Sequence, residues 1–283
     1  PRFPYWRMLV LDHYERGSFS RSSRDAGRLH PIQQTGSRYY LSPRTLPSEL
    51  ASDQGYEWTI YLEGSVSRFL PYPGAFGAVR FQKIEEFEYD SVLGTVNLKR
   101  IPSTTTVFQL AGLHPETAFL PSVLDRNGMS HETRFVSPSD AMAMQEIQYP
   151  ETTQTLILNE ADREYLGSLV QSIQRETASA GSGDYLDHAV DHLHRNHEYS
   201  LSPPRFVASG LDDDPVIEWM RMGSPGHCEY FAAAFTLLSR AAGYPCRIIK
   251  GFSGGEWSEY SEYFVVRNRN AHAWCEVYDP SSG

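Results

Sequence analysis

Cysteine is scarce in this chain, which has only three: Cys228, Cys246 and Cys275. An odd and sparse set is not a disulfide framework, and without paired CxxC spacing it does not predict a structural zinc site. Cys246 and Cys275 could pair in an oxidising compartment, and one thiol would then remain free. We predict no cofactor and no metal from these residues.

Basic residues and long apolar runs are also in short supply. Lysine and arginine number 25 against 35 acidic residues, a net charge of −10, which argues against a nucleic-acid partner. No stretch of about 18 apolar residues is present, so no segment is predicted to span a membrane. The chain opens on Pro1 without a basic and apolar leader, and we therefore expect it to be part of a longer protein.

The first half of the sequence has the period of β-strands. Short apolar or alternating segments are separated by glycine and proline turns, and they occur at residues 5–12, 58–63, 81–84, 92–98 and 105–110. This predicts a β-rich domain over residues 1–150, built as an antiparallel sandwich or barrel-like sheet. Residues 137–158 are predicted to be a connection.

The second half begins with the period of helices. Apolar residues at i, i+3 and i+4 spacing predict helices over residues 161–177 and 185–193, a short helix from Pro215 capped by Asp214, and a helix from Cys228. Strands are then expected at 246–252, 263–268 and 272–278. We predict an α+β domain over residues 151–283.

Cys228 lies where a glycine-containing loop meets the predicted helix. Free N–H groups and the helix dipole favour a thiolate there and could stabilise an oxyanion. A cysteine nucleophile needs a base, and His272 follows 44 positions later at the start of a predicted strand. A helix that begins at cysteine and packs on a sheet bearing histidine is a papain-like arrangement.

Three segments resemble the transglutaminase-like superfamily in order and spacing. They are Gly226-His227-Cys228-Glu229-Tyr230-Phe231-Ala232, the Ala242–Arg247 stretch running into Gly251-Phe252, and Ala271-His272-Ala273-Trp274-Cys275-Glu276-Val277-Tyr278. Tyr5-Trp6-Arg7, Leu11-Asp12 and Tyr199-Ser200 also resemble the extracytoplasmic part of a bacterial membrane-anchored family within it. The resemblance implies a papain-like core, catalytic Cys228 and His272, and a periplasmic or cell-surface location. It also implies that membrane helices outside this chain anchor the parent protein.

The resemblance also implies a third catalytic residue, an aspartate on the strand after the histidine strand. Asp279 does not fit: an odd separation puts it on the opposite face of a regular strand from His272, roughly 23 Å away. We therefore expect the aspartate beyond Gly283, with the core truncated at its C-terminal end. Asn268 and Asn270 are the alternatives for orienting the imidazole.

Other polar and aromatic residues have simpler interpretations. Trp274 is assigned to the core or the site wall, with substrate binding as the alternative, and Glu276 is either structural or the ion-pair partner of Arg247. His188, His192, His194 and His197 are assigned to a solvated helix face, because the sequence offers no third metal ligand. The acidic run 212–214 is assigned to a loop with a helix cap, because it lacks the ligand spacing of a calcium site.

The predicted reaction is acyl transfer on protein or peptide carboxamides through a thioester. Amine or water would resolve that thioester, giving transamidation or deamidation. Two alternatives remain open: a cysteine protease or amidase acting on envelope peptides, and a non-catalytic envelope scaffold with a degenerate fold. The sequence does not indicate the oligomeric state.

Overall fold

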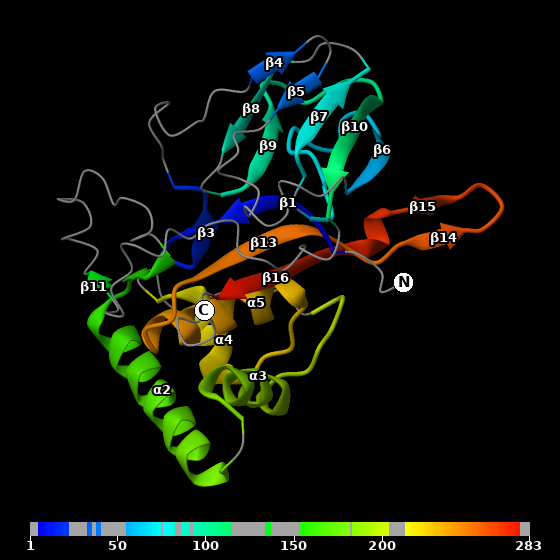
Figure 1. The fold of residues 1–283 in the computed structure, drawn as a ribbon. Helices are drawn as coiled ribbons and strands as arrows, with labels where there is room; N and C mark the ends of the chain where they lie inside the picture. Colours follow the sequence, from blue (N-terminus) through cyan, green and yellow to red (C-terminus); the bar gives the residue numbers. More distant parts are fainter. Residues whose placement is uncertain are drawn as a thin grey trace. The chain divides into compact units, whose positions relative to one another are not determined.

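A computed structural model of the chain describes residues 5–22, 33–35, 38–40, 55–74, 76–82, 86–90, 93–114, 134–136, 153–181, 183–203 and 213–277. The chain divides into two compact units, each assembled from separated segments. Unit 1 contains residues 1–10, 23–124 and 250–272, and unit 2 contains residues 11–22, 125–249 and 273–283. Helices and antiparallel sheets together confirm the predicted α+β class (Figure 1).

Unit 1 is built on a five-stranded antiparallel sheet. Its strand order is β4 (Gln33–Thr35), β5 (Arg38–Tyr40), β7 (Ala78–Phe81), β10 (Thr106–Leu113) and β6 (Tyr56–Leu62). Alternate residues of β10, including Phe108 and Leu110, enter a core shared with β7 and β9. A separate antiparallel pair joins β8 (Phe87–Asp90) to β9 (Thr95–Leu98).

A second antiparallel hairpin in unit 1 joins β14 (Glu256–Ser258) to β15 (Tyr263–Val265). Phe264 at its base packs its ring near Trp257, Trp58 and Trp6, with centroids 4.8, 5.9 and 6.3 Å away. The indole N–H of Trp6 donates to the Gly254 carbonyl oxygen at 2.9 Å. The hairpin is therefore fixed to strand segments more than 190 positions earlier in the chain.

Unit 2 contains the α-helices of the described residues. They are α2 (Glu160–Ala180), α3 (Tyr185–Asn196), α4 (Pro215–Met222) and α5 (Cys228–Ala241). Each begins after a residue whose side chain accepts from a backbone N–H of the first turn: Asn159, Asp184, Asp214 and His227. Their apolar faces form one core with residues of β12 (Thr155–Ile157) and β13 (Cys246–Ser253).

Two further sheets complete the described elements. One has the order β11 (Arg134–Val136), β12, β2 (His13–Glu15) and β3 (Ser18–Ser20). The other has the order β1 (Tyr5–Leu11), β13 and β16 (Ala271–Val277).

Most predicted elements are confirmed. The differences concern the position of one strand, the end of another, and one strand that was not predicted. The strand expected at 81–84 is β7 at Ala78–Phe81, and β15 ends at Val265 because the 3-10 helix η5 (Asn268–Asn270) follows. Residues 155–157, assigned to a connection, form β12, whose parallel pairing with distant strands leaves no local signal. Among the described residues, no helix has both the length and the apolar character needed to cross a membrane.

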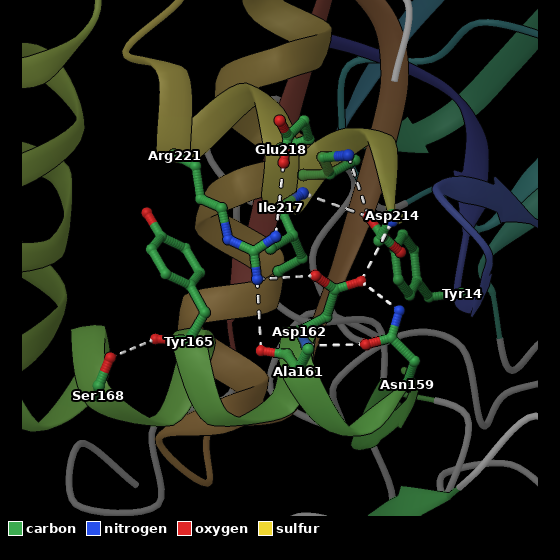
Figure 2. A network of polar contacts seen from close by, with 11 residues as sticks. Tyr14, Asn159, Ala161, Asp162, Tyr165, Ser168, Asp214, Ile217, Glu218 and Arg221 are labelled. Carbon is green, nitrogen blue, oxygen red and sulfur yellow. Dashed lines mark hydrogen bonds and ion pairs between the residues drawn. The ribbon is translucent and has the colours of Figure 1, made fainter. Parts of the chain in front are cut away.

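A buried polar network joins the N-termini of α2 and α4 to β2 (Figure 2). Tyr14 donates its hydroxyl to Asp214, with distances of 2.5 and 2.6 Å to the two carboxylate oxygens. The Asp214 backbone N–H donates to Asp162 at 3.1 Å, and Arg221 forms an ion pair with Asp162 at 3.0 Å. Burial raises the pKa of Asp214, and the Tyr14 hydroxyl partly opposes that rise. The network fixes the start of α4, the helix that supports the loop before Cys228.

Replacing Tyr14 by phenylalanine tests this network. The pKa of Asp214 is higher in the folded state than in the unfolded state. Its carboxyl group therefore favours folding at acidic pH, and this contribution is lost as the pH rises through the pKa of the folded state. Loss of the hydroxyl raises this pKa further. We expect Tyr14→Phe to lower the free energy of unfolding by about 1.5–3 kcal/mol at pH 7. The loss should shrink below about pH 4, where the carboxyl is protonated in both states.

Denaturant unfolding at several pH values measures this loss, with Tyr260→Phe as the control because Tyr260 is 99% exposed. A Tyr14→Phe loss that did not change with pH would contradict the account.

Candidate active site

Cys228 is the first residue of α5 and is partly exposed. His227 precedes it in extended conformation, and its Nδ1 accepts from the Glu229 backbone N–H at 3.3 Å. The N-terminal N–H groups of a helix lack partners within the helix and carry its positive dipole end. Cys228 therefore lies at the start of a helix, as predicted from the sequence.

The loop before Cys228 is fixed by residues of α4 and by the residue after α3. The indole N–H of Trp219 donates to the Pro225 carbonyl oxygen at 3.1 Å. His197 stacks on Trp219 with ring centroids 3.7 Å apart, and its Nδ1 donates to the Ser224 carbonyl oxygen at 2.9 Å. Burial lowers the pKa of His197, so its imidazole is neutral at pH 7. Because His197 is buried, its assignment to a solvated helix face was wrong.

A short extended segment lies beside the same loop. Tyr199 and Gly226 form an isolated parallel bridge, with Ser200 N–H donating to Gly226 O at 2.9 Å and Gly226 N–H donating to Glu198 O at 3.0 Å. The Tyr199 ring lies 5.9 Å from that of Phe231, one turn after Cys228 on α5. The sequence analysis did not assign Tyr199 to the site, since 29 positions separate it from Cys228 and no periodicity relates them.

Gly226 is required for the close packing of this loop. A Cβ at this position would lie 2.8 Å from Tyr230 Cβ and 3.1 Å from Trp219 Cζ2. We expect Gly226→Ala to displace the loop, to lower the free energy of unfolding by about 1–3 kcal/mol and to slow alkylation of Cys228. Gly167→Ala is the matched control, because a Cβ there meets no atom within 4 Å. Equal alkylation rates in the two variants would contradict this role.

His272 is the second residue of β16 and is half-buried. Its ring faces that of Tyr5, with centroids 6.0 Å apart, and burial lowers its pKa. The imidazole is therefore neutral at pH 7, the protonation state that a general base requires. His272 belongs to unit 1 and Cys228 to unit 2, and their pairing stays a prediction.

Asn270 is poorly suited to orient the imidazole of His272. Its Oδ1 accepts from the Arg267 backbone N–H at 2.9 Å, and its Nδ2 donates to the Ser253 carbonyl oxygen at 3.3 Å. Both ends of the amide thus stabilise η5. Asp279 lies outside the described residues.

Two other residues of β16 were considered in the sequence analysis. Glu276 forms a buried ion pair with Arg247 of β13, with Oε2 at 2.8 Å from Nη2 and 2.9 Å from Nε, which confirms the ion-pair alternative. Trp274 is partly exposed, and its assignment stays a prediction.

Cys246 and Cys275 are free thiols that meet at Thr236 of α5. The Thr236 hydroxyl lies 3.5 Å from Cys246 Sγ and 3.2 Å from Cys275 Sγ, and Cys275 donates to the Ala232 carbonyl oxygen at 3.1 Å. Burial raises the pKa of Cys275. These contacts hold β13 and β16 against α5.

The described residues contain no group of three or more His, Cys, Asp or Glu side chains that could hold a metal ion.

The cap predicted at Asp214 is confirmed, since its Oδ1 accepts from the Val216 and Ile217 backbone N–H groups at 3.0 and 3.3 Å. Asp212 lies outside the described residues.

Residues 168–283 match the family model described as the transglutaminase-like superfamily.

Among individual relatives, a protein-glutamine gamma-glutamyltransferase of Pseudomonas aeruginosa is 37% identical over 91 residues. The uncharacterized protein YebA of Bacillus subtilis is 38% identical over 76 residues. These matches span 31% and 25% of this chain but only 13% and 10% of the relatives.

The fold also matches crystal structures of the periplasmic domain of TgpA from Pseudomonas aeruginosa. The structure bound to ethylmercury has a TM-score of 0.61 at 17% identity, and the match covers 100% of this chain and 83% of that one. A second structure of that domain gives a TM-score of 0.57 at 18% identity, covering 99% and 79%. These similarities establish the fold.

Proposed function

We propose that this chain catalyses acyl transfer on protein or peptide carboxamides, with Cys228 as the nucleophile and His272 as the general base and acid. The observation that carries the proposal is the place of Cys228 at the first position of α5, after a loop fixed by Trp219 and His197. The superfamily match over residues 168–283 supports a cysteine-dependent enzyme at this position.

The motif resemblance supports the pairing of Cys228 with His272, because both residues lie in the part of the chain that matches the superfamily model. The lowered pKa of His272 supports its role as a base at neutral pH. For the group that orients its imidazole, we propose an aspartate that follows Gly283.

The reaction would proceed through a thioester. His272 accepts the thiol proton of Cys228, and the thiolate forms a bond with the carboxamide carbon. Backbone N–H groups at the start of α5 stabilise the oxyanion that develops. The C–N bond then breaks, and the imidazolium gives its proton to the leaving ammonia. A primary amine or water attacks the thioester, His272 accepts its proton, and the C–S bond breaks to release the Cys228 thiolate, giving an amide conjugate or a carboxylic acid.

The parent protein is proposed to act outside the cytoplasm, anchored by membrane helices that lie outside this chain. The fold of the TgpA periplasmic domain and the motif resemblance support this location. The glutamyltransferase similarity supports a glutamine side chain as the acyl donor.

A product assay tests this function. The purified chain is incubated with glutamine-containing peptides and a fluorescent primary amine, and the products are separated by mass spectrometry. We expect amide conjugates or deamidated glutamine, and treatment with iodoacetamide should abolish both. Cleaved peptide bonds without either product would identify a protease instead. Absence of all products, together with an unreactive Cys228, would favour the scaffold alternative.

A further inference from the structure

Cys246 and Cys275 lie close together in the interior of unit 2, on neighbouring strands of one sheet. Cys246 is the first residue of β13, and Cys275 lies in β16. Both sulfur atoms contact the hydroxyl oxygen of Thr236 on α5, which lies 3.5 Å from Cys246 Sγ and 3.2 Å from Cys275 Sγ. The distance between the two sulfur atoms therefore cannot exceed the sum of these two contacts.

A buried ion pair joins the same two strands immediately beside the thiols. Arg247 and Glu276 follow directly after the two cysteines, and Arg247 Nη2 lies 2.8 Å from Glu276 Oε2. Successive side chains of a strand point to opposite faces, so the ion pair lies on one face of the sheet and the thiols lie on the face that contacts α5. Two cysteines on neighbouring strands with side chains on one face have the arrangement from which a disulfide bond can form.

We propose that Cys246 and Cys275 are a disulfide site, oxidised by exchange with an external disulfide, and that the bond ties β16 to β13. The proposal does not depend on acyl transfer, because neither residue belongs to the proposed catalytic pair. It accounts for the odd number of cysteines: two of the three pair inside unit 2, and Cys228 keeps its thiol at the start of α5.

The oxidation consists of two exchange steps that reduce the external disulfide to two thiols. Cys275 is the more accessible of the pair, and its thiolate attacks one sulfur of the external disulfide. A mixed disulfide forms and the first thiolate leaves. The Cys246 thiolate then attacks Cys275 Sγ, the bond between the two cysteines forms, and the second thiolate leaves. The two protons lost by the protein thiols pass to the two leaving thiolates, so atoms, electrons and charge balance.

The buried guanidinium of Arg240 favours the second step. Arg240 donates to the Cys246 carbonyl oxygen from Nε at 2.9 Å and from Nη2 at 2.7 Å. Burial opposes ionisation of the Cys246 thiol, but hydrogen bonds and the positive charge of Arg240 outweigh it and lower the pKa of Cys246. A cation beside a cysteine stabilises the thiolate that attacks in disulfide exchange.

Equilibration of the native chain with glutathione tests the proposal. The purified chain is incubated with mixtures of reduced and oxidised glutathione, then alkylated with iodoacetamide under denaturing conditions and mapped by mass spectrometry. In the most oxidising mixture, we expect more than about nine tenths of the chains to contain one cross-linked pair of peptides, joined through Cys246 and Cys275. Cys228 should stay outside the cross-link. Circular dichroism confirms that the oxidised chain is folded.

Cys228→Ala and Cys246→Ala are the matched variants, since each removes one thiol and leaves two. Cys228→Ala should form the same cross-link as wild type, whereas Cys246→Ala should form none. The cross-linked wild type should also unfold at a higher urea concentration than the same chain treated with dithiothreitol, because the bond restricts the unfolded state.

Three results would overturn the proposal. They are Cys246 and Cys275 both alkylated in the most oxidising mixture, a cross-link that includes Cys228, and a Cys246–Cys275 cross-link that lowers the urea midpoint. The last result would mean that the native sheet does not accept the bond. The product assay on the reduced chain tests acyl transfer separately, so failure of one proposal is distinguished from failure of the other.

Discussion

Replacement of Cys228 by alanine is expected to lower the rate of amide conjugation or deamidation by about 10⁴-fold or more. The thioester requires a sulfur at this position, and the other two thiols are placed elsewhere: Cys246 is buried and Cys275 donates to Ala232 inside unit 2. The helix should form normally, because His227, and not Cys228, provides its cap. The measurement is product formation under saturating peptide and amine.

Cys275→Ser is the matched control for this variant. Serine can still donate to the Ala232 carbonyl oxygen, so unit 2 is expected to fold and the rate to stay near that of wild type. Residual activity of Cys228→Ala above one hundredth of the wild-type rate would exclude Cys228 as the nucleophile. Loss of activity in Cys275→Ser with an intact fold would show that Cys275 takes part in the reaction, which contradicts this account.

The largest effect on stability is expected at the Arg247–Glu276 ion pair. Arg247 is fully buried and Glu276 nearly so, and two N–H groups of one guanidinium meet one carboxylate oxygen. Glu276→Gln removes the negative charge that this buried guanidinium contacts. We expect a loss of about 3–5 kcal/mol in the free energy of unfolding. Circular dichroism during urea unfolding follows unit 2, since the four α-helices of the described residues lie in it.

The double variant Arg247→Leu with Glu276→Leu distinguishes two contributions to the free energy of unfolding: the destabilisation by one buried charge and the net contribution of the ion pair. Replacing both partners by apolar residues is often neutral or stabilising, so the double variant should be more stable than Glu276→Gln. Glu86→Gln, which breaks an exposed pair with Lys99, should produce no measurable change. A Glu276→Gln loss as small as that of Glu86→Gln would show that the pair does not hold β16 to β13.

The helical half of the fold could be predicted closely from sequence. Apolar spacing and caps marked α2 to α5, and Asp214 with Pro215 marked the start of α4 within one residue. The strands were less certain, because pairing depends on distant partners: β12 pairs with β2 about 140 positions away, and neither segment contains that information locally.

The candidate site was also predicted only in part from the sequence. The sequence placed Cys228 at a helix start because a glycine-containing loop and an apolar period meet there, and the structure confirms that place. It did not indicate Tyr199, nor that His197 is buried against Trp219, because these contacts arise only when α3, α4 and α5 pack together. The pairing of Cys228 with His272 and the role of Trp274 stay predictions from the motifs.

The most direct test of the central claim is the alkylation rate of the three cysteines against pH, resolved by peptide mapping. The account predicts that Cys228 reacts fastest of the three, because it is partly exposed at the start of α5. Cys246 and Cys275 should react slowly, since both contact Thr236 in the interior and burial raises the pKa of Cys275. A Cys228 that reacts no faster than these two would contradict an activated nucleophile at the start of α5.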